Sequence, residues 1–457
     1  MEKINRERKL FMTALAVMTV ISLCAVSAAS LQSAAEADDK IEFELDNVFG
    51  LSYAAPMRIL STDDGYAIAG RVSISNYGQG IFADVDGTDS DYGFVLILDK
   101  AGQIQWLNVE ESIGRHYFSS IKQTQDSGFV AAGSWHGNDG ILFKYDQNGE
   151  IEWINESINN GQEMSFRDVL VVDDGYIVST SMGLTGTHAF LIKFDLDGEL
   201  EWIKEVDEYI LTNLANMAFV GDRLISIGSF SDVLHILDKG AMVCCFDQDG
   251  ELEWIKEFDG LTFRDIATDG ERIFVVGYKN NYGILLVLDS DGEVLESIEY
   301  RYEGEETLFY AVTYFENCII AGGEVGIDVW EEECALLVAF DVTGDVLWEM
   351  IFGDGSMIGA VDATADGFAA CVEYWEEIDE LPSPDDNFAC IASFTLSTSA
   401  DQEASGGFCC LLIIIFILSL ILTVIGVRIA FSATVPGIIF TLFFAAITIW
   451  IATKLLV

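Results

Sequence analysis

The chain has 457 residues, of which 75 are acidic and 23 are basic, so its formal net charge at pH 7 is −52. An acidic surface of this kind repels nucleic acid and anionic lipid head groups, which excludes both as partners of the soluble part. Length alone would suggest about three domains, but an internal repeat overrules that division.

The N-terminal segment, residues 1–37, is predicted to be a signal peptide or signal anchor. Four basic residues precede an apolar run from Leu10 to Ala29, which ends in small residues. A basic start, an apolar run and small residues at its end are the features of a secretory signal. The run is also long enough to remain as an uncleaved anchor, and both alternatives export the segment that follows.

The region 41–398 is organised by a repeated turn-and-strand motif. Its clearest copy is D-Q-D-G-E-L-E-W-I-K-E-F, Asp247 to Phe258, which predicts a tight turn followed by a strand with one Trp. With this copy included, the copies begin 42 to 52 residues apart, at Asp99, Asp146, Asp195, Asp247, Asp289 and Asp341. Periods of roughly 40–50 residues indicate propellers or other repeat arrays.

Each unit combines this motif with three further strand-like runs, and D-G turns recur between the first run and the second. Four short strands per unit, repeated seven times, predict an all-β, seven-bladed β-propeller. The last unit lacks a strand after its third run, whereas residues 41–50 alternate like a strand that has no partner. We therefore expect strand 41–50 to close the ring as the outer strand of the last blade.

Four segments that differ between units are expected to be variable loops and to carry any binding function. These segments are 76–92, 228–240, 323–333 and 376–387. Residues 399–407 are predicted to be a flexible linker. The apolar runs 408–427 and 435–453 are each long enough to span a bilayer, so we expect a transmembrane helical hairpin.

The stretch A-F-D-V-T-G-D-V-L-W-E, Ala339 to Glu349, resembles the tryptophan-docking strand of quinoprotein (PQQ-like) β-propellers. The run D-D-G-Y-A-I-A-G, 63–70, is similar to repeats in exported archaeal and bacterial surface proteins. The resemblance implies that the Trp of each unit packs between adjacent blades. That role would fall to Trp106, Trp153, Trp202, Trp254 and Trp348, while one copy carries Glu296 in place of Trp.

The dehydrogenases of this family bind a quinone with calcium ligands and a vicinal cysteine pair. Cys244 and Cys245 are vicinal, but they fall in a predicted strand and no further cofactor motif accompanies them. Propellers of this type without a cofactor serve as binding or assembly scaffolds. The resemblance therefore implies a non-enzymatic role without a resident cofactor.

One acidic cluster is a candidate calcium site. Asp84, Asp86, Asp89 and Asp91 lie within eight residues and offer several carboxylate oxygens, whereas a D-x-D-G turn offers too few. The four histidines match no zinc signature.

Four cysteines are candidates for disulfide bonds within a unit. Cys318 and Cys334, and likewise Cys371 and Cys390, fall on runs predicted to be neighbouring strands. Two disulfides within units are one alternative in an oxidising compartment, and buried free thiols are the other.

These features favour a membrane-anchored extracytoplasmic propeller at the cell surface that binds a surface protein, a membrane protein or a glycan. One alternative is a quinoprotein-like oxidoreductase. The other is a calcium-assisted adhesion or polysaccharide-binding domain.

Overall fold

The computed structural model describes the strand-forming part of the chain. The described residues are 42–51, 54–72, 80–82, 91–111, 113–135, 139–156, 164–182, 189–206, 211–232, 235–326, 333–374 and 388–397. The predicted signal, linker and transmembrane runs lie outside them. Among the described residues, no helix combines the length and the apolar character needed to cross a bilayer.

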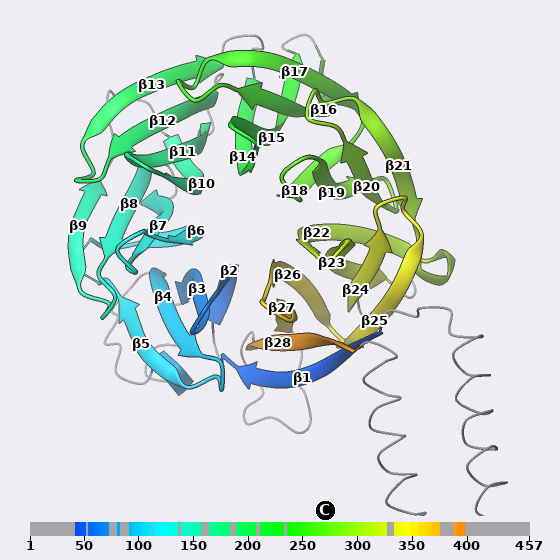
Figure 1. Ribbon diagram of the computed structural model, residues 1–457, viewed down its shortest axis with the longest axis horizontal. Coiled ribbons are helices and arrows are strands. Elements are labelled where there is room, and N and C mark those ends of the chain that lie inside the picture. The colour runs from blue at the N-terminus through cyan, green and yellow to red at the C-terminus, as the bar shows by residue number, and fades with distance from the viewer. Residues whose placement is uncertain are drawn as a thin grey trace, which may run out of the picture. The chain divides into compact units, whose positions relative to one another are not determined.

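The fold is an all-β propeller, because its sheets are arranged in a closed ring (Figure 1). The innermost strand of each sheet contacts the innermost strand of the next, and the last of them contacts the first. These strands are β2 (Ala54–Thr62), β6 (His116–Gln123), β10 (Met164–Val172), β14 (Leu211–Val220), β18 (Thr262–Thr268), β22 (Glu306–Phe315) and β26 (Ser356–Ala363).

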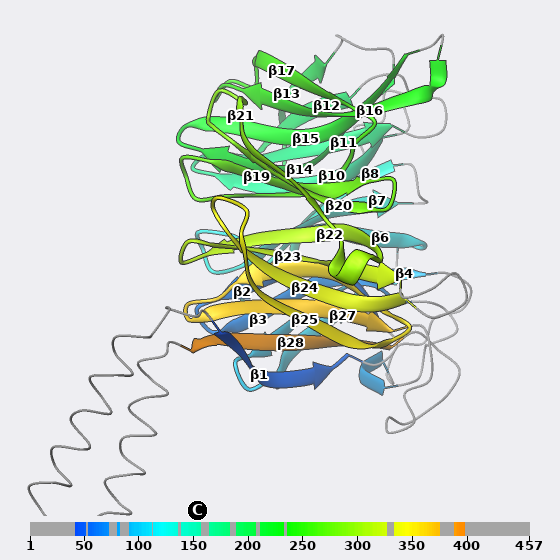
Figure 2. The same cartoon turned by 90° about the vertical axis from the view of Figure 1, so that its right-hand side faces the viewer.

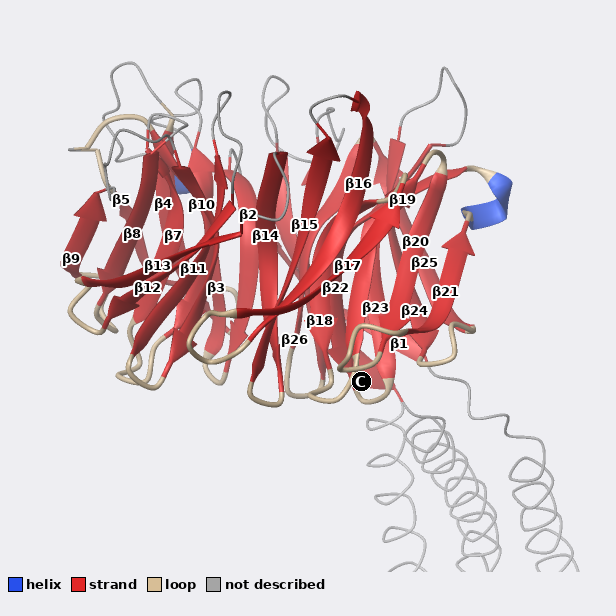
Figure 3. Cartoon of the chain, turned by 90° about the horizontal axis from the view of Figure 1, so that it is seen from above, coloured by secondary structure: helices blue, strands red, loops and turns tan. Residues whose placement is uncertain are grey.

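The second strand of each sheet pairs antiparallel with the innermost one. The short turns between the two lie along one edge of the ring (Figure 3). The second strands are β3 (Gly65–Val72), β7 (Phe129–Trp135), β11 (Gly175–Met182), β15 (Arg223–Asp232), β19 (Ile273–Lys279), β23 (Cys318–Gly326) and β27 (Gly367–Tyr374).

The third strands are almost wholly buried, because each packs against a neighbouring sheet on both faces. Their apolar runs, such as G-F-V-L-I-L-D, show little of the polar alternation of the outer strands. They are β4 (Tyr92–Asp99), β8 (Asp139–Tyr145), β12 (Ala189–Asp195), β16 (His235–Phe246), β20 (Tyr282–Leu288), β24 (Glu333–Asp341) and β28 (Phe388–Ser397).

The outer strands follow the D-x-x-G turns in all sheets but the last. They are β5 (Ile104–Val109), β9 (Ile151–Glu156), β13 (Leu200–Val206), β17 (Leu252–Asp259), β21 (Val294–Tyr300) and β25 (Val346–Asp354). In the last sheet the outer strand is β1 (Glu42–Gly50), which pairs with β28 as the sequence predicts (Figures 1 and 2). The first and last elements of the ring therefore share one sheet.

Hydrophobic clusters fill the spaces between neighbouring sheets. One of them joins the first sheet to the last, and it combines Ile59 and Ile68 with Ala360, Cys371 and Ile391. The sheets from β6 to β17 are also linked by single residue pairs, Met164 with Asp139 and Ser181 with Asn213, so that they form one continuous hydrogen-bonded sheet. The ring is thus closed by packing and by strand pairing.

The prediction that 228–240 is a loop was wrong. Residues up to Asp232 extend β15 and residues from His235 extend β16, with Ser229 opposite Ala241 and Phe230 opposite Gly240. Likewise, residues 323–326 of the predicted loop 323–333 belong to β23. Residues 323–325 are buried, Val325 completely, but Gly323 and Glu324 interrupt the apolar pattern by which a strand is recognised in the sequence.

Candidate functional site

The D-x-x-G turns are stabilised by their own first Asp. In the turn at Asp247, Oδ1 accepts the backbone N–H of Asp249 at 2.9 Å and of Glu251 at 2.8 Å. Gly250 follows with φ +76°, in the left-handed region that favours glycine. Asp247 Oδ1 thus accepts two hydrogen bonds that stabilise the turn. The sequence favours this structural role for Asp247 over metal binding.

The Trp residues of the outer strands pack on the next sheet of the ring. A Cβ built on Gly149 would lie 2.6 Å from the Trp106 ring, and one on Gly198 would lie 2.8 Å from Trp153. Trp202 covers Gly250 and Trp254 covers Gly292 in the same way. Each of these four Trp rings therefore lies against the turn glycine of the following unit, and a side chain at the glycine would collide with the ring.

Two positions use another residue for this contact. Phe49 of β1 covers Gly102, which joins the last sheet to the first, and Ile298 covers Gly344 in the unit that has Glu296 instead of Trp. Trp348 packs beside Phe43 of β1 and Phe368 of β27, with ring centres 5.4 and 6.3 Å away. Every Trp that the resemblance assigned to docking thus has an inter-strand or inter-sheet packing partner.

A polar residue two positions after the Trp strengthens the same contact, and sequence reasoning missed it. Asn108 Nδ2 donates to the carbonyl of Gly149 at 3.3 Å, and Asn155 Nδ2 donates to that of Gly198 at 2.7 Å. In the next units Lys204 pairs with Glu251, and Lys256 pairs with Glu293 at 2.6 Å. The signal was available, because W-x-N and W-x-K recur in the repeats.

A buried charge network occupies the centre of the ring. Arg58 on β2 places Nη1 3.2 Å from Asp265 Oδ1 of β18 and Nη2 3.7 Å from Asp168 Oδ2 of β10. Both carboxylates are buried, with side chains no more than 3% exposed. All three residues follow a β-bulge, a device that redirects side chains.

The same carboxylates also connect neighbouring sheets. Asp168 Oδ2 accepts the backbone N–H of Met217 at 2.8 Å, and Asp265 Oδ2 accepts that of Val312 at 3.0 Å. Ser120 donates to Asp168 Oδ1 at 2.5 Å. Because every carboxylate oxygen has a donor and Arg58 supplies the opposite charge, this network is a structural centre rather than an open site.

A second polar cluster, the axial mouth, lies at the end of the ring opposite the D-G turns. It comprises Arg264 of β18, Tyr278 of β19, Tyr310 of β22 and Glu324 of β23. The exposed Arg264 donates from Nη2 to Tyr278 Oη at 3.0 Å, and its guanidinium lies 5.3 and 5.6 Å from the ring centres of Tyr278 and Tyr310. Such stacking holds a cationic fork in a fixed orientation.

Carboxyl groups border the axial mouth. Tyr310 Oη donates to Glu324 Oε1 at 2.6 Å, and burial raises the pKa of Glu324 above its ordinary value. Glu373 occupies the equivalent register position in the last sheet, one residue beyond the bulge pair. Burial raises the pKa of Glu373 to about 7, although Arg71 opposes the shift. Sequence reasoning missed this cluster, because its members come from different units.

The predicted calcium cluster falls mostly outside the described residues. Asp84, Asp86 and Asp89 lie there, whereas Asp91 is described, with Oδ2 3.7 Å from Arg115 Nη2. Within the described ranges no group of three His, Cys, Asp or Glu side chains has the geometry to hold a metal ion. The calcium prediction therefore stays a prediction.

The two predicted disulfides do not match the strand register. Cys318 lies opposite Asp341 and Cys334 opposite Val325, seven residues further along the pair, which is far beyond the reach of a disulfide. Cys371 lies opposite Ile391, so Cys390 projects from the other face of the sheet. All four are buried thiols, and burial raises the pKa of Cys318 to about 11. The runs are neighbouring strands as expected, and their register contradicts the disulfide alternative and supports the buried thiols.

The vicinal cysteines do not form a cofactor lid. Cys244 and Cys245 lie side by side within β16 and are fully buried, with their side chains in different hydrophobic clusters on the two faces of the sheet. Burial raises the pKa of Cys245 to about 12, so its thiol stays protonated. Two thiols on opposite faces do not fit the stacking role that vicinal cysteines have in the quinone-binding dehydrogenases.

Comparisons with known proteins find distant structural similarity and no sequence relative. No family profile and no curated protein matches the sequence. Similar solved structures include a europium-containing methanol dehydrogenase (12% identity, 77% of this chain and 93% of that chain, TM-score 0.42). Another is the β-propeller domain of the trilobed protease from Pyrococcus furiosus (10% identity, 76% and 97%, TM-score 0.48).

A third is a quinohemoprotein alcohol dehydrogenase from Pseudomonas putida (10% identity, 77% and 76%, TM-score 0.46). These are distant similarities of structure alone. At such identities and TM-scores they assign no activity and no ligand to this chain.

Proposed function

We propose that the chain is a membrane-anchored, extracytoplasmic propeller of seven blades that binds a surface protein, a membrane protein or a glycan at the axial mouth. The anchor would be the helical hairpin 408–427 and 435–453, and export would follow from the signal in residues 1–37. The seven-blade count is supported by the cyclic contacts between innermost strands.

The proposed binding role rests on the environment of the Arg264 side chain. Within the described part of the ring its guanidinium has a tyrosine hydroxyl and two aromatic rings as neighbours, and it has no carboxylate ion pair. Arg and Tyr are enriched among residues that dominate interface energies. A stacked and exposed guanidinium can receive a carboxylate or carbonyl oxygen of a partner without losing much side-chain entropy.

The test is chemical cross-linking of the full chain in its own membranes, followed by identification of the adducts. We expect an adduct that is lost in Arg264→Ala and kept in Arg272→Ala. Arg272 is a matched control, because it also lies over an aromatic ring, that of Phe274, but it pairs with Asp269 at the opposite end of the same sheet. Equal adduct patterns in both variants would contradict binding at the axial mouth.

Two alternatives have direct tests of their own. A quinoprotein-like oxidoreductase is supported by the docking-strand motif at Ala339–Glu349, and a quinone absorbance band in the purified protein would favour it over a binding module. A calcium-assisted adhesion or polysaccharide-binding domain rests on Asp84, Asp86, Asp89 and Asp91. A rise in melting temperature at millimolar calcium, together with chelator-sensitive binding on a glycan array, would favour that alternative.

A further inference from the structure

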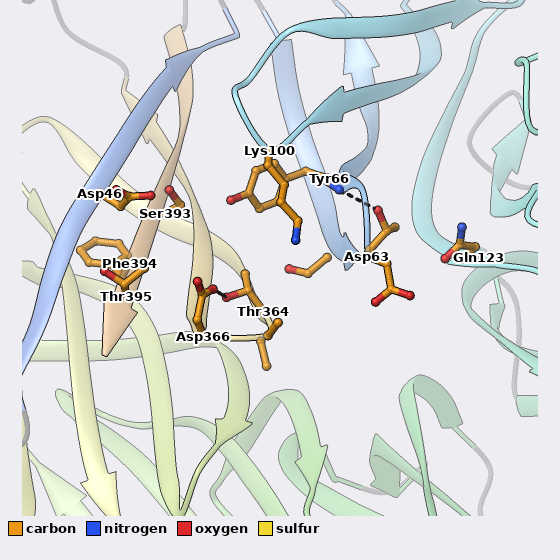
Figure 4. Close-up of a pocket in the computed structure, with 15 residues that line it drawn as sticks. Asp46, Asp63, Tyr66, Lys100, Gln123, Thr364, Asp366, Ser393, Phe394 and Thr395 are labelled. Atoms are coloured by element: carbon orange, nitrogen blue, oxygen red, sulfur yellow. Dashed lines mark hydrogen bonds between the residues drawn. The ribbon is translucent and has the colours of Figure 1, made fainter. Parts of the chain in front are cut away.

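A pocket of about 370 Å³ lies where the first and last sheets of the ring meet, at the edge that carries the D-G turns (Figure 4). Asp46 of β1 and Ser393 of β28 line it from the last sheet, and Tyr66 of β3 lines it from the first. The turns at Asp63 and Asp366 complete the wall. The pocket is at the other end of the strands from the axial mouth, so the two sites are separate.

The polar groups of this pocket are mainly acceptors. Three carboxylates, those of Asp46, Asp63 and Asp366, face one ammonium group, that of Lys100. In Figure 4 the Tyr66 hydroxyl points toward Asp46 and Ser393, and the Lys100 amino group points into the space between the turns. The excess of negative charge favours a cationic occupant.

Two buried hydroxyls that belong to this wall have no hydrogen-bond partner among the described residues. They are Ser393 Oγ, in a residue that is 5% exposed, and Ser61 Oγ. Ser393 Oγ is close enough to the Tyr66 hydroxyl (Figure 4) to oppose the rise that burial causes in the Tyr66 pKa, but the two hydroxyls do not reach the geometry of a full hydrogen bond. An unpaired buried hydroxyl is costly, so its presence beside a pocket indicates a missing donor or acceptor.

We propose that the pocket binds a small organic cation that carries a primary ammonium group. Such a group offers three N–H donors to carboxylate and hydroxyl oxygens, whereas the described residues contain no cluster of three side chains suited to a metal ion. The volume lies near the lower limit for small-ligand pockets, roughly 300 Å³, and suits a compact amine. Because its walls come from both the first and the last sheet, the bound amine stabilises the closed ring.

The experiment is thermal melting of the full chain in detergent with ethanolamine as the probe. Tetramethylammonium at the same ionic strength is the reference, because it carries the same charge without an N–H donor. We expect a saturable rise in melting temperature with ethanolamine beyond that reference. A rise no larger than that of tetramethylammonium would overturn the proposal, and so would saturation by calcium chloride but not by ethanolamine.

Variants test the position of the site in opposite directions. Asp366→Asn removes a charged acceptor, so the half-saturating ethanolamine concentration should increase about tenfold. Lys100→Met removes the competing cation from an exposed position and should lower that concentration. Asp345→Asn, the same change on another exposed turn, is the control and should leave the half-saturating ethanolamine concentration unchanged. Equal responses of the Asp366 and Asp345 variants, or weaker binding by Lys100→Met, would place the effect elsewhere.

Discussion

Arg58 is the residue on which the centre of the ring most depends, because it is the cation that faces two buried carboxylates. Burial alone would lower the pKa of Arg58, but Asp265 and Asp168 raise it above its ordinary value. The guanidinium therefore stays charged at any pH at which the protein folds. Its contribution is to keep two carboxylates from being buried without a counter-charge.

We expect Arg58→Met to lower the free energy of unfolding by about 3–5 kcal/mol, since it leaves both carboxylates uncompensated. Urea denaturation measures this loss. Arg115→Met is the control, because that side chain is 64% exposed and lies 3.7 Å from Asp91, and its loss should stay below about 1 kcal/mol. Similar losses for the two variants would show that the central network is not a buried charge system.

The raised pKa of Glu373, beside the axial mouth, leads us to expect that the free energy of unfolding depends on pH. Burial raises its pKa to about 7 in the folded protein, whereas an unfolded Glu titrates at about 4.3. Between these values the folded state binds the extra proton, so stability falls as pH rises through this window. In urea titrations from pH 4.5 to 7.5, Glu373→Gln should remove part of this fall, on the order of 2–3 kcal/mol. An unchanged pH profile, matching that of exposed Glu271→Gln, would argue against a protonated Glu373.

At the scale of the strand, the contact between an outer strand and the next turn is the repeated unit of cohesion. A large side chain lies on a glycine with positive φ, and where a polar residue follows two positions later it ties the same turn. The glycine is thus needed twice, once for the backbone conformation and once for the space.

Gly149→Ala and Gly270→Ala separate the cost of the backbone conformation from the cost of the lost space. Both glycines have positive φ, +85° and +92°, but an added Cβ would lie 2.6 Å from Trp106 at Gly149 and meets nothing within 4 Å at Gly270. We expect Gly270→Ala to cost about 1 kcal/mol from backbone strain, and Gly149→Ala about 1–3 kcal/mol more from displacement of the ring. Denaturant midpoints of the two variants, together with Trp fluorescence, measure the difference. Equal costs would mean that the ring moves freely.

The sequence predicts the elements that depend on local chemistry. Turn residues and alternating strands identify the D-x-x-G hairpins, and the period of the repeat identifies the propeller. It does not predict the Arg58 network, because Arg58 and Asp265 are 207 residues apart and converge only when the ring is formed. The sequence left disulfides and buried thiols open for a related reason, since neighbouring strands do not reveal which residues lie opposite each other.

At the scale of the whole molecule, the ring depends on the joint between its first and last elements. Phe43 of β1 is 3% exposed and packs edge-on against Trp348 and Phe368, while Leu45 on the same strand is 44% exposed. The joint is therefore held by a specific aromatic contact in addition to backbone pairing. The prediction of strand 41–50 as the closing strand came from a missing repeat element, which is a property of the whole chain.

Phe43→Ala should lower the free energy of unfolding by about 3–5 kcal/mol, as expected for a buried aromatic side chain. Hydrogen exchange should increase in β28 before it increases in the other sheets, because loss of β1 exposes that strand edge. Leu45→Ala is the matched control on the same strand and should leave exchange in β28 unchanged. Exchange that rises uniformly around the ring in Phe43→Ala would show that closure is not a separate step.

The pairing of β1 with β28 also has a mechanical consequence. The backbone N–H of Leu51 donates to the carbonyl of Ala389, so the end of β1 lies beside the start of β28 and the two strands run antiparallel. The chain therefore enters and leaves the ring at neighbouring points. Tension applied between those points loads the hydrogen bonds of this pair one after another, as in a zipper, and spares the other sheets. The ring would yield at this joint first and could re-form there once the tension is released.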